Sequence, residues 1–229
     1  MERGFTLWFT GLSGSGKTTL AQIAEHALRE RGRRVELLDG DAVRTHLSKG
    51  LGFSREDRDT NILRIGFVCQ LLTRNGIVAI ASAISPYRGT RDQVRAMVGD
   101  FVEVFVDTPL EECQRRDIKG LYRQALAGQL AAFTGVSDPY EPPLAAELTI
   151  TTVGQTPEQS ARAIIRWLEM RGYLDQAPER AAAVPVGTNG AHGANGAHGA
   201  NGANDGQAAA YSAEEEAAVS ARLEALGYL

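Results

Sequence analysis

The sequence contains only two cysteines, Cys69 and Cys113, which stand far apart and form no CxxC pair. This spacing argues against a disulfide framework or a thiolate metal site, so we expect two buried, reduced thiols in a cytoplasmic protein. Residues 1–4 are too few for a signal peptide, which supports the same location. No apolar run reaches the roughly 18 residues that a membrane-spanning helix needs, so we expect no membrane partner.

The chain also lacks an excess of positive charge. Its 24 Lys and Arg residues are outnumbered by 28 Asp and Glu residues, which gives a formal net charge of −4. This balance does not favour binding to nucleic acid or to an anionic membrane, so we expect no nucleic-acid partner. Any anionic ligand must therefore be bound by local groups.

Hydrophobic residues make up 43% of the chain, which is enough for a substantial core. Short apolar runs alternate with amphipathic helical patterns through the first 174 residues. This alternation predicts an α/β fold, a doubly wound parallel sheet of about five strands with helices on both faces. The expected strands are residues 5–10, 34–38, 77–82, 101–106 and 148–152, and the clearest helices are residues 18–31, 57–74 and 157–170.

The character of the chain changes after this predicted domain, residues 1–174. Residues 175–210 show no hydrophobic periodicity, and within them the six-residue unit NGAHGA repeats. This composition indicates a disordered, flexible linker rather than a histidine metal site. Residues 211–229 predict a short amphipathic helix that begins with a capping box at Ser212 and Glu215. Such a short helix is marginal alone in water, so we expect it to dock. The long linker favours another subunit or a partner protein over the helix's own domain.

Residues 11–18 read GLSGSGKT and fit the pattern G-x-x-x-x-G-K-[ST] between a predicted strand and a predicted helix. Glycines let the backbone N–H groups surround a phosphate, and the helix N-terminus adds positive potential. Lys17 is expected to reach the β- and γ-phosphates, and Thr18 to bind Mg²⁺. The motif predicts ATP or GTP binding on a P-loop NTPase-type fold, with an ordinary glycine-rich turn as the alternative. Because the guanine-reading pattern N-K-x-D is absent, a small-molecule kinase is favoured.

Polar residues near the ends of other predicted strands are candidates for binding the acceptor. Asp39 and Asp41 follow the second strand, where carboxylates can hold Mg²⁺, accept a proton or simply cap a helix. Arg44 lies one turn further if a helix begins there. Arg58 and Asn61 share a helix face, which suits an anionic ligand but is also typical of a solvated surface.

Two further segments are polar or basic near the predicted site. Ser85 lies in the turn ISPYR after the third strand, where it could contact substrate, carry phosphate or serve only the turn. A basic segment, residues 115–123, precedes an apolar helix and is typical of the lid that P-loop kinases close over phosphates. Phe133, after this segment, could stack on a base or fill a core.

Six motifs together resemble those of adenylyl-sulfate (APS) kinases: GLSGSGKTT, LDGDAVR, LGFSREDRDTN, ISPYR, RDIKGLY and FTGVSDPYEPP. The resemblance covers residues 5–174. It implies transfer of the γ-phosphate of ATP to the 3′-hydroxyl of adenylyl sulfate, which gives 3′-phosphoadenylyl sulfate (PAPS) in sulfate assimilation. It also implies Mg²⁺ as a cofactor and a homodimer. A P-loop kinase for another small acceptor and a non-catalytic scaffold are the alternatives.

The resemblance implies the site residues as well. ATP would be bound by Gly11, Leu12, Ser13, Gly14, Ser15, Gly16, Lys17, Thr18 and Thr19. Adenylyl sulfate would be bound by Asp41, Arg44, Phe53, Arg58, Asn61, Ile84, Ser85, Lys119 and Phe133, with the adenine between the two phenylalanines. Mg²⁺ would be held by Thr18, Asp39 and Asp41. Lys17 and Asp41 would be catalytic, and Ser85 matches a serine described as a phosphoserine intermediate in some family members.

The sequence departs from the family pattern in two places. Ala42 follows the DGD motif where the family usually has Asn. The resemblance implies a lid over residues 116–133, and its segment QALAGQLAAF has Leu126 and Ala131 at two positions that are commonly basic. We expect the lost lid charge to alter ligand binding or product release rather than the type of reaction.

Overall fold

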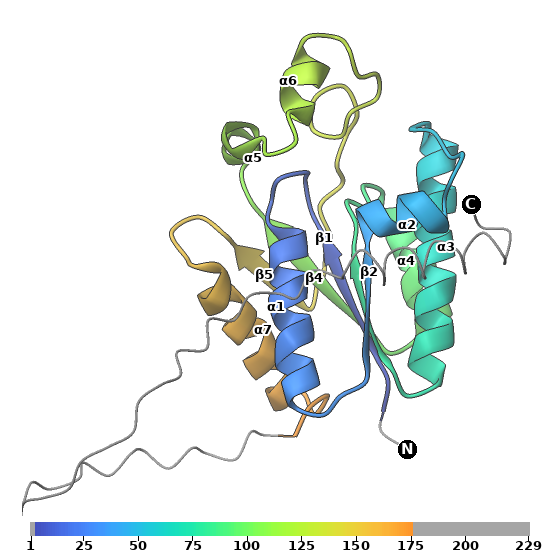
Figure 1. Ribbon diagram of the computed structural model, residues 1–229, viewed down its shortest axis with the longest axis vertical. Helices are drawn as coiled ribbons and strands as arrows, with labels where there is room; N and C mark the ends of the chain where they lie inside the picture. Colours follow the sequence, from blue (N-terminus) through green and yellow to red (C-terminus); the bar gives the residue numbers. More distant parts are fainter. Residues whose placement is uncertain (1–2, 176–229) are drawn as a thin grey trace, which may run out of the picture. The chain divides into compact units, whose positions relative to one another are not determined.

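The computed structural model describes residues 3–175 (Figure 1). Apart from residue 175, the predicted linker and C-terminal helix lie outside these residues. Within residues 3–175, no helix is long and apolar enough to cross a membrane. Cys69 and Cys113 are both free and buried, as the sequence predicts.

Five strands form one open, parallel sheet in the order β2-β3-β1-β4-β5. Each strand end lies within one residue of its predicted position, and the predicted fold class is confirmed. The strands are β1 (Thr6–Thr10), β2 (Val35–Asp39), β3 (Val78–Ser82), β4 (Phe101–Asp107) and β5 (Leu148–Thr151).

Helices cover both faces of the sheet (Figure 1). The pair α1 (Lys17–Glu30) and α7 (Pro157–Met170) covers one face, and the pair α3 (Arg55–Arg74) and α4 (Arg88–Val98) covers the other. Residues of β1 alternate between the two cores, because successive strand side chains point to opposite faces. Leu7 and Phe9 pack with α1 and α7, whereas Trp8 packs with α3 and α4.

Three short helices complete the described part: α2 (Gly40–His46), α5 (Leu110–Arg116) and α6 (Leu121–Leu126). Figure 1 shows α5 and α6 beyond the edge of the sheet at which β1 and β4 end. This is the edge where open α/β sheets bind ligands. The segment predicted to form a lid therefore stands over the predicted site.

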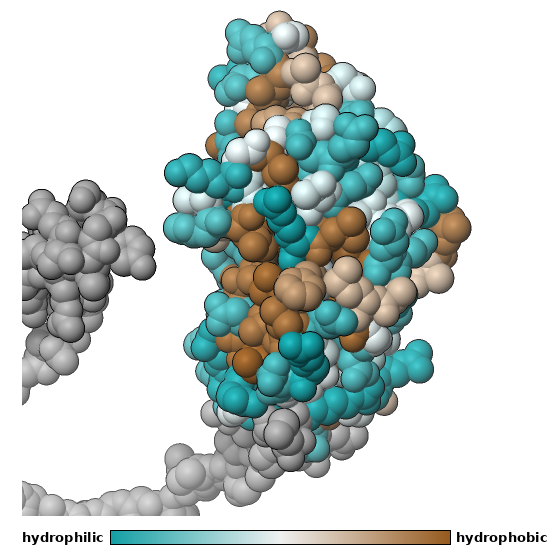
Figure 2. All heavy atoms as spheres, turned by 90° about the vertical axis from the view of Figure 1, so that its right-hand side faces the viewer, coloured by the Kyte–Doolittle hydropathy of each residue, from teal (hydrophilic) through white to brown (hydrophobic). Residues whose placement is uncertain are grey.

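The long helix α3 is apolar on two sides. Its inner side chains Ile62, Ile65 and Cys69 are buried against the sheet. Its outer side, which lies on the face seen in Figure 2, carries a shallow apolar hollow. The hollow is lined by Leu47, Thr60, Leu63, Arg64, Phe67 and Val68. Phe67 is 53% exposed, which is unusual for so large an apolar side chain.

Candidate active site

The phosphate-binding loop connects the end of β1 to the start of α1, as the motif requires. Gly11, Gly14 and Gly16 have φ values of 147°, 74° and 103°, a region that residues with a side chain rarely adopt. A Cβ on Gly11 would also lie only 2.6 Å from the Val106 carbonyl oxygen. Gly16 has no side chain to cap α1, so the first N–H groups of this helix are available to an anion.

Lys17 begins α1 and is almost fully buried. Its Nζ donates to the Leu12 carbonyl oxygen at 2.7 Å and to Ser15 Oγ at 3.5 Å. Burial is the main cause that lowers the pKa of Lys17 to about 8, and the charge of the exposed Lys119 contributes in the same direction. Phosphate oxygens would therefore give this desolvated ammonium group the anionic partners that favour its charged form.

Oxygen atoms from three elements meet beside the loop. Thr18 Oγ1 in α1 donates to Asp39 Oδ2 at the end of β2, at 2.9 Å. The same hydroxyl lies 3.3 Å from Ser82 Oγ at the end of β3. Hard oxygen donors of this kind fit Mg²⁺, which usually keeps water and phosphate as further ligands. Asp41, the third predicted ligand, belongs to α2, one turn before Arg44, but its side chain lies outside the described part of the structure.

Groups from the lid side hold the loop in place. Tyr122 of α6 donates its hydroxyl to the Ser13 carbonyl oxygen at 3.0 Å. Thr108, which follows β4, donates to the Ser15 carbonyl oxygen at 3.0 Å. Arg116, the last residue of α5, places Nη1 3.4 Å from that same oxygen. The donor loop is thus fixed both by its own glycines and by the segments that close over it.

Arg44, Phe53, Arg58 and Asn61, four of the predicted acceptor residues, lie in or between α2 and the first turns of α3. The Phe53 ring is 57% exposed, and the guanidinium carbons of Arg44 and Arg58 lie 4.6 Å and 6.0 Å from its centroid. Asn61 is buried one turn after Arg58, and within residues 3–175 its Oδ1 has no hydrogen-bond partner. Here a buried hydrogen-bond acceptor without a partner lies near two arginines and the exposed Phe53 ring. This arrangement suits an anionic ligand that carries a base.

The remaining aromatic residue, Phe133, lies in the segment after α6. Its ring packs edge-on against Tyr122, with the centroids 5.1 Å apart. Arg58 donates from Nη1 to Thr134 Oγ1 at 2.5 Å, and from Nη2 to the Ala132 carbonyl oxygen. In this structure the Arg58 guanidinium is therefore engaged with the lid segment on both sides of Phe133.

Ser85 occupies a strained turn after β3. It has a φ of 40° and is 2% exposed. Its Oγ accepts from Trp8 Nε1 at 3.1 Å and donates to Thr10 Oγ1 at 2.9 Å, while the neighbouring Ile84 carbonyl accepts from the Thr10 hydroxyl at 2.9 Å. In this structure the Ser85 hydroxyl is therefore enclosed by protein and hydrogen-bonded to two side chains of β1.

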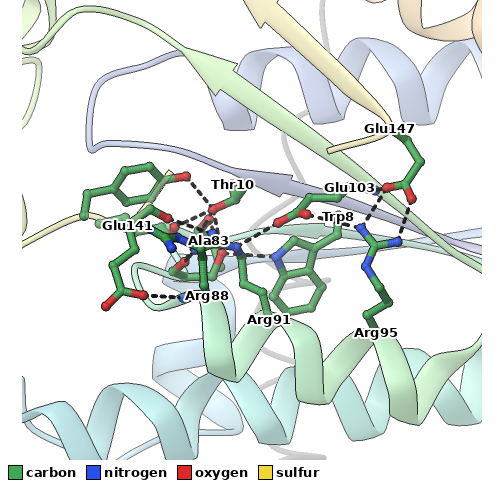
Figure 3. A network of polar contacts seen from close by, with 12 residues as sticks. Trp8, Thr10, Ala83, Arg88, Arg91, Arg95, Glu103, Glu141 and Glu147 are labelled. Atoms are coloured by element: carbon green, nitrogen blue, oxygen red, sulfur yellow. Dashed lines mark hydrogen bonds and ion pairs between the residues drawn. The ribbon is translucent and has the colours of Figure 1, made fainter. Parts of the chain in front are cut away.

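A buried ionic network supports this turn from α4 (Figure 3). Arg91 Nε donates to Glu103 Oε1 at 2.8 Å, and its Nη atoms donate to the carbonyl oxygens of Ser85 at 2.6 Å and Glu141 at 2.7 Å. Arg95 Nη2 lies 3.2 Å from the other oxygen of Glu103. One arginine therefore ties the acceptor-side turn, β4 and the segment after the lid together.

Several residues that make these contacts were not predicted from the sequence. They include Ser82, Arg91, Tyr122 and Thr134. Tyr122 and Thr134 lie inside RDIKGLY and FTGVSDPYEPP, so the motifs contained a signal without showing the partners. Ser82 ends a buried strand and Arg91 lies within a helix, where no local pattern distinguishes a site residue from a structural one.

An open parallel sheet with a P-loop, a hydroxyl–carboxylate pair beside it and two short helices beyond the same edge has the fold of a P-loop kinase. The chain belongs to the adenylylsulphate kinase family, whose model matches residues 3–151. The adenylyl-sulfate kinase of Rippkaea orientalis (strain PCC 8801 / RF-1) is 58% identical over 173 residues, which cover 76% of this chain and 96% of that protein.

Solved structures agree with this assignment. The Mycobacterium tuberculosis APS kinase CysC in complex with AMPPNP and APS is 44% identical, with a TM-score of 0.71. The match covers 74% of this chain and 99% of that one. A hexameric APS kinase from Thiobacillus denitrificans is 42% identical, with a TM-score of 0.60 over 76% of this chain and 30% of that one.

Proposed function

We propose that this protein is an adenylyl-sulfate kinase, which transfers the γ-phosphate of ATP to the 3′-hydroxyl of adenylyl sulfate and so forms PAPS. The observation that carries the proposal is that this family member has both a phosphate-binding loop for ATP and a separate surface suited to an anionic nucleotide. A complete P-loop lies at the carboxyl ends of the strands. A second surface at α2 and the start of α3 carries Arg44, Arg58 and the exposed ring of Phe53. The family relatives support adenylyl sulfate as the acceptor.

On the donor side, residues 11–19 surround the phosphates of ATP with backbone N–H groups. Lys17 leaves its carbonyl partner to bind the β- and γ-phosphate oxygens, and the surrounding burial strengthens this interaction. Thr18, Asp39 and Asp41 hold Mg²⁺, which neutralises charge on the phosphates when it is bound. Thr18 and Asp39 already lie within hydrogen-bond distance of each other, which supports this assignment.

On the acceptor side, Phe53 and Phe133 stack on the two faces of the adenine. Arg44 and Arg58 bind the anionic groups, and Asn61 offers its unpaired Oδ1 to a donor on the ligand. Ile84 and Lys119 complete the contacts, and Ser85 acts by holding its turn. The exposed Leu126 of α6 stands where the family commonly has a basic residue, so the lid contributes less charge than is usual.

The reaction forms a bond between the 3′-oxygen of the acceptor and the γ-phosphorus. The bond from that phosphorus to the bridging oxygen of ATP breaks, and ADP leaves with the electron pair. The hydroxyl proton passes to a carboxylate, for which we propose Asp41. Because such a transfer proceeds mainly by positioning and electrostatic stabilisation, it requires no covalent enzyme intermediate.

The direct test is to incubate the full chain with Mg-ATP and adenylyl sulfate and to measure PAPS and ADP by chromatography. We expect stoichiometric formation of both, and a loss of several orders of magnitude in kcat for Asp41→Ala. Binding of both nucleotides without formation of PAPS would contradict the proposed function. Phosphorylation of a competing nucleotide or sugar acid in its place would identify the alternative acceptor.

We further propose a cytoplasmic homodimer, with a protein partner for residues 211–229. The hexameric relative and the exposed apolar hollow on α3 support self-association. Light scattering after size-exclusion chromatography tests the oligomeric state, and a monomer at micromolar concentration would contradict it. Cross-linking with and without residues 211–229 tests whether that segment recruits a partner.

A further inference from the structure

The guanidinium group of Arg58 joins two segments that are far apart in the sequence. Arg58 is 7% exposed and lies in the first turn of α3. Its Nε donates to the Phe53 carbonyl oxygen at 2.9 Å. Its Nη1 donates to Thr134 Oγ1 at 2.5 Å, and its Nη2 donates to the Ala132 carbonyl oxygen. The fixed fork of a guanidinium group suits such a set of three acceptors, which a lysine could not satisfy in the same way.

These three acceptors flank the two aromatic residues of the acceptor side. One bond is to the backbone of Phe53 itself, and the other two are to the residues directly before and after Phe133. Ala132 has a φ of 52°, a conformation that a residue with a Cβ rarely adopts. The Arg58 bond to its carbonyl helps to hold this conformation, and therefore the direction in which the chain enters Phe133.

The segment that Arg58 contacts forms a turn with its own backbone hydrogen bonds. The backbone N–H groups of Val136, Ser137 and Asp138 all donate to the Phe133 carbonyl oxygen, at 3.0, 3.1 and 3.1 Å. Asp138 Oδ2 accepts from the Tyr87 hydroxyl at 2.9 Å and lies 3.7 Å from Arg58 Nε. Anchoring one point of such a turn positions the whole of it, including the Phe133 ring.

We infer that Arg58, in addition to binding the acceptor, positions Phe133 opposite Phe53, and that Thr134, the residue after Phe133, is its anchor. The inference rests on the proposed function, in which the adenine of the acceptor lies between these two rings. The new element is that the two rings take up positions on both sides of the acceptor site only when Arg58 is hydrogen-bonded to Ala132 and Thr134. The bond from the lid to the P-loop is made by a different residue, Tyr122, whose ring packs edge-on against Phe133. That bond does not involve Arg58 and remains when the anchor is removed.

The test removes the anchor without touching Arg58 or either ring. Thr134 is 1% exposed, and Thr134→Val keeps its shape while removing the oxygen that accepts from Arg58. We expect the KM for adenylyl sulfate to rise about tenfold, the typical effect of losing a hydrogen bond to a charged group, with the KM for ATP unchanged. Thr134→Ser retains the hydroxyl and should return the KM for adenylyl sulfate toward the wild-type value.

A second measurement is independent of catalysis. Amide hydrogen exchange in residues 133–138 of the ligand-free protein should be faster in Thr134→Val than in Thr134→Ser, because the turn loses its anchor to α3. An unchanged KM for adenylyl sulfate, or an equal rise in both KM values, would overturn the inference. Unaltered exchange in residues 133–138 would do the same, even for a protein that makes no PAPS. Failure of the wild type to form PAPS would count against the proposed function instead.

Discussion

The donor and acceptor sides of this site are built in opposite ways. The donor side is a run of nine consecutive residues, 11–19, whose glycines shape the backbone around the phosphates. The acceptor side is assembled from residues far apart in the chain, among them Arg44, Phe53, Asn61 and Phe133. A phosphate can be bound by backbone N–H groups, whereas a specific nucleotide needs side chains that the fold must bring together.

The two sides are also held by different forces. The shortest side-chain contacts from outside the donor loop to its carbonyl oxygens are 3.0 Å hydrogen bonds from the neutral hydroxyl groups of Tyr122 and Thr108, while the charged Arg116 lies further away at 3.4 Å. The acceptor-side turn is fixed by the charged Arg91, whose guanidinium is 2% exposed and paired with Glu103. The comparison predicts that a substitution in the donor loop lowers turnover, whereas loss of the buried charge behind the acceptor-side turn lowers the free energy of unfolding.

The largest effect is expected on the donor side, from Lys17→Ala. The change removes the ammonium group that would bind the β- and γ-phosphates, so kcat should fall by at least about a thousandfold at saturating ATP and acceptor. Lys49→Ala, which removes an exposed ammonium group elsewhere, should leave kcat within about twofold. Steady-state measurement of PAPS formation checks both. Near-normal turnover in Lys17→Ala would mean that the donor side does not depend on this residue.

The difference between a donor side of consecutive residues and an acceptor side of distant residues also explains which parts of the site the sequence could predict. The strands and the P-loop follow from local patterns, and Lys17, Thr18 and Asp39 lie where those patterns place them. The shared helix face made Arg58 and Asn61 candidates for an anionic ligand, but a solvated surface has the same pattern, so only the family resemblance gave them a role at the acceptor. The contacts between Arg58 and Thr134 link residues 76 positions apart, so only the folded chain shows them.

Glu103→Ala tests the claim that the acceptor-side turn depends on buried charge. The variant leaves the buried Arg91 without its carboxylate partner, which is expected to lower the free energy of unfolding by about 3–5 kcal/mol. The matched control is Glu25→Ala, which breaks the more exposed pair with Arg29 and should cost less than about 1 kcal/mol. Urea unfolding of both variants gives the two values. Equal destabilisation would show that the Arg91 network does not distinguish the two sides.

The smallest expected effect is a difference in how the affinities for ATP and for adenylyl sulfate depend on pH. The pKa of Lys17 is about 8 without ligand because the group is buried, and bound phosphates would raise it, so ATP binding takes up a proton. ATP affinity should therefore fall as pH rises above 8, by about tenfold per unit at most. Affinity for adenylyl sulfate should stay constant from pH 7 to about 9.5, because arginine guanidinium groups remain charged. Calorimetric titration of each nucleotide measures both profiles. A constant ATP profile, or two profiles that fall together, would remove the distinction between a lysine-based donor side and an arginine-based acceptor side.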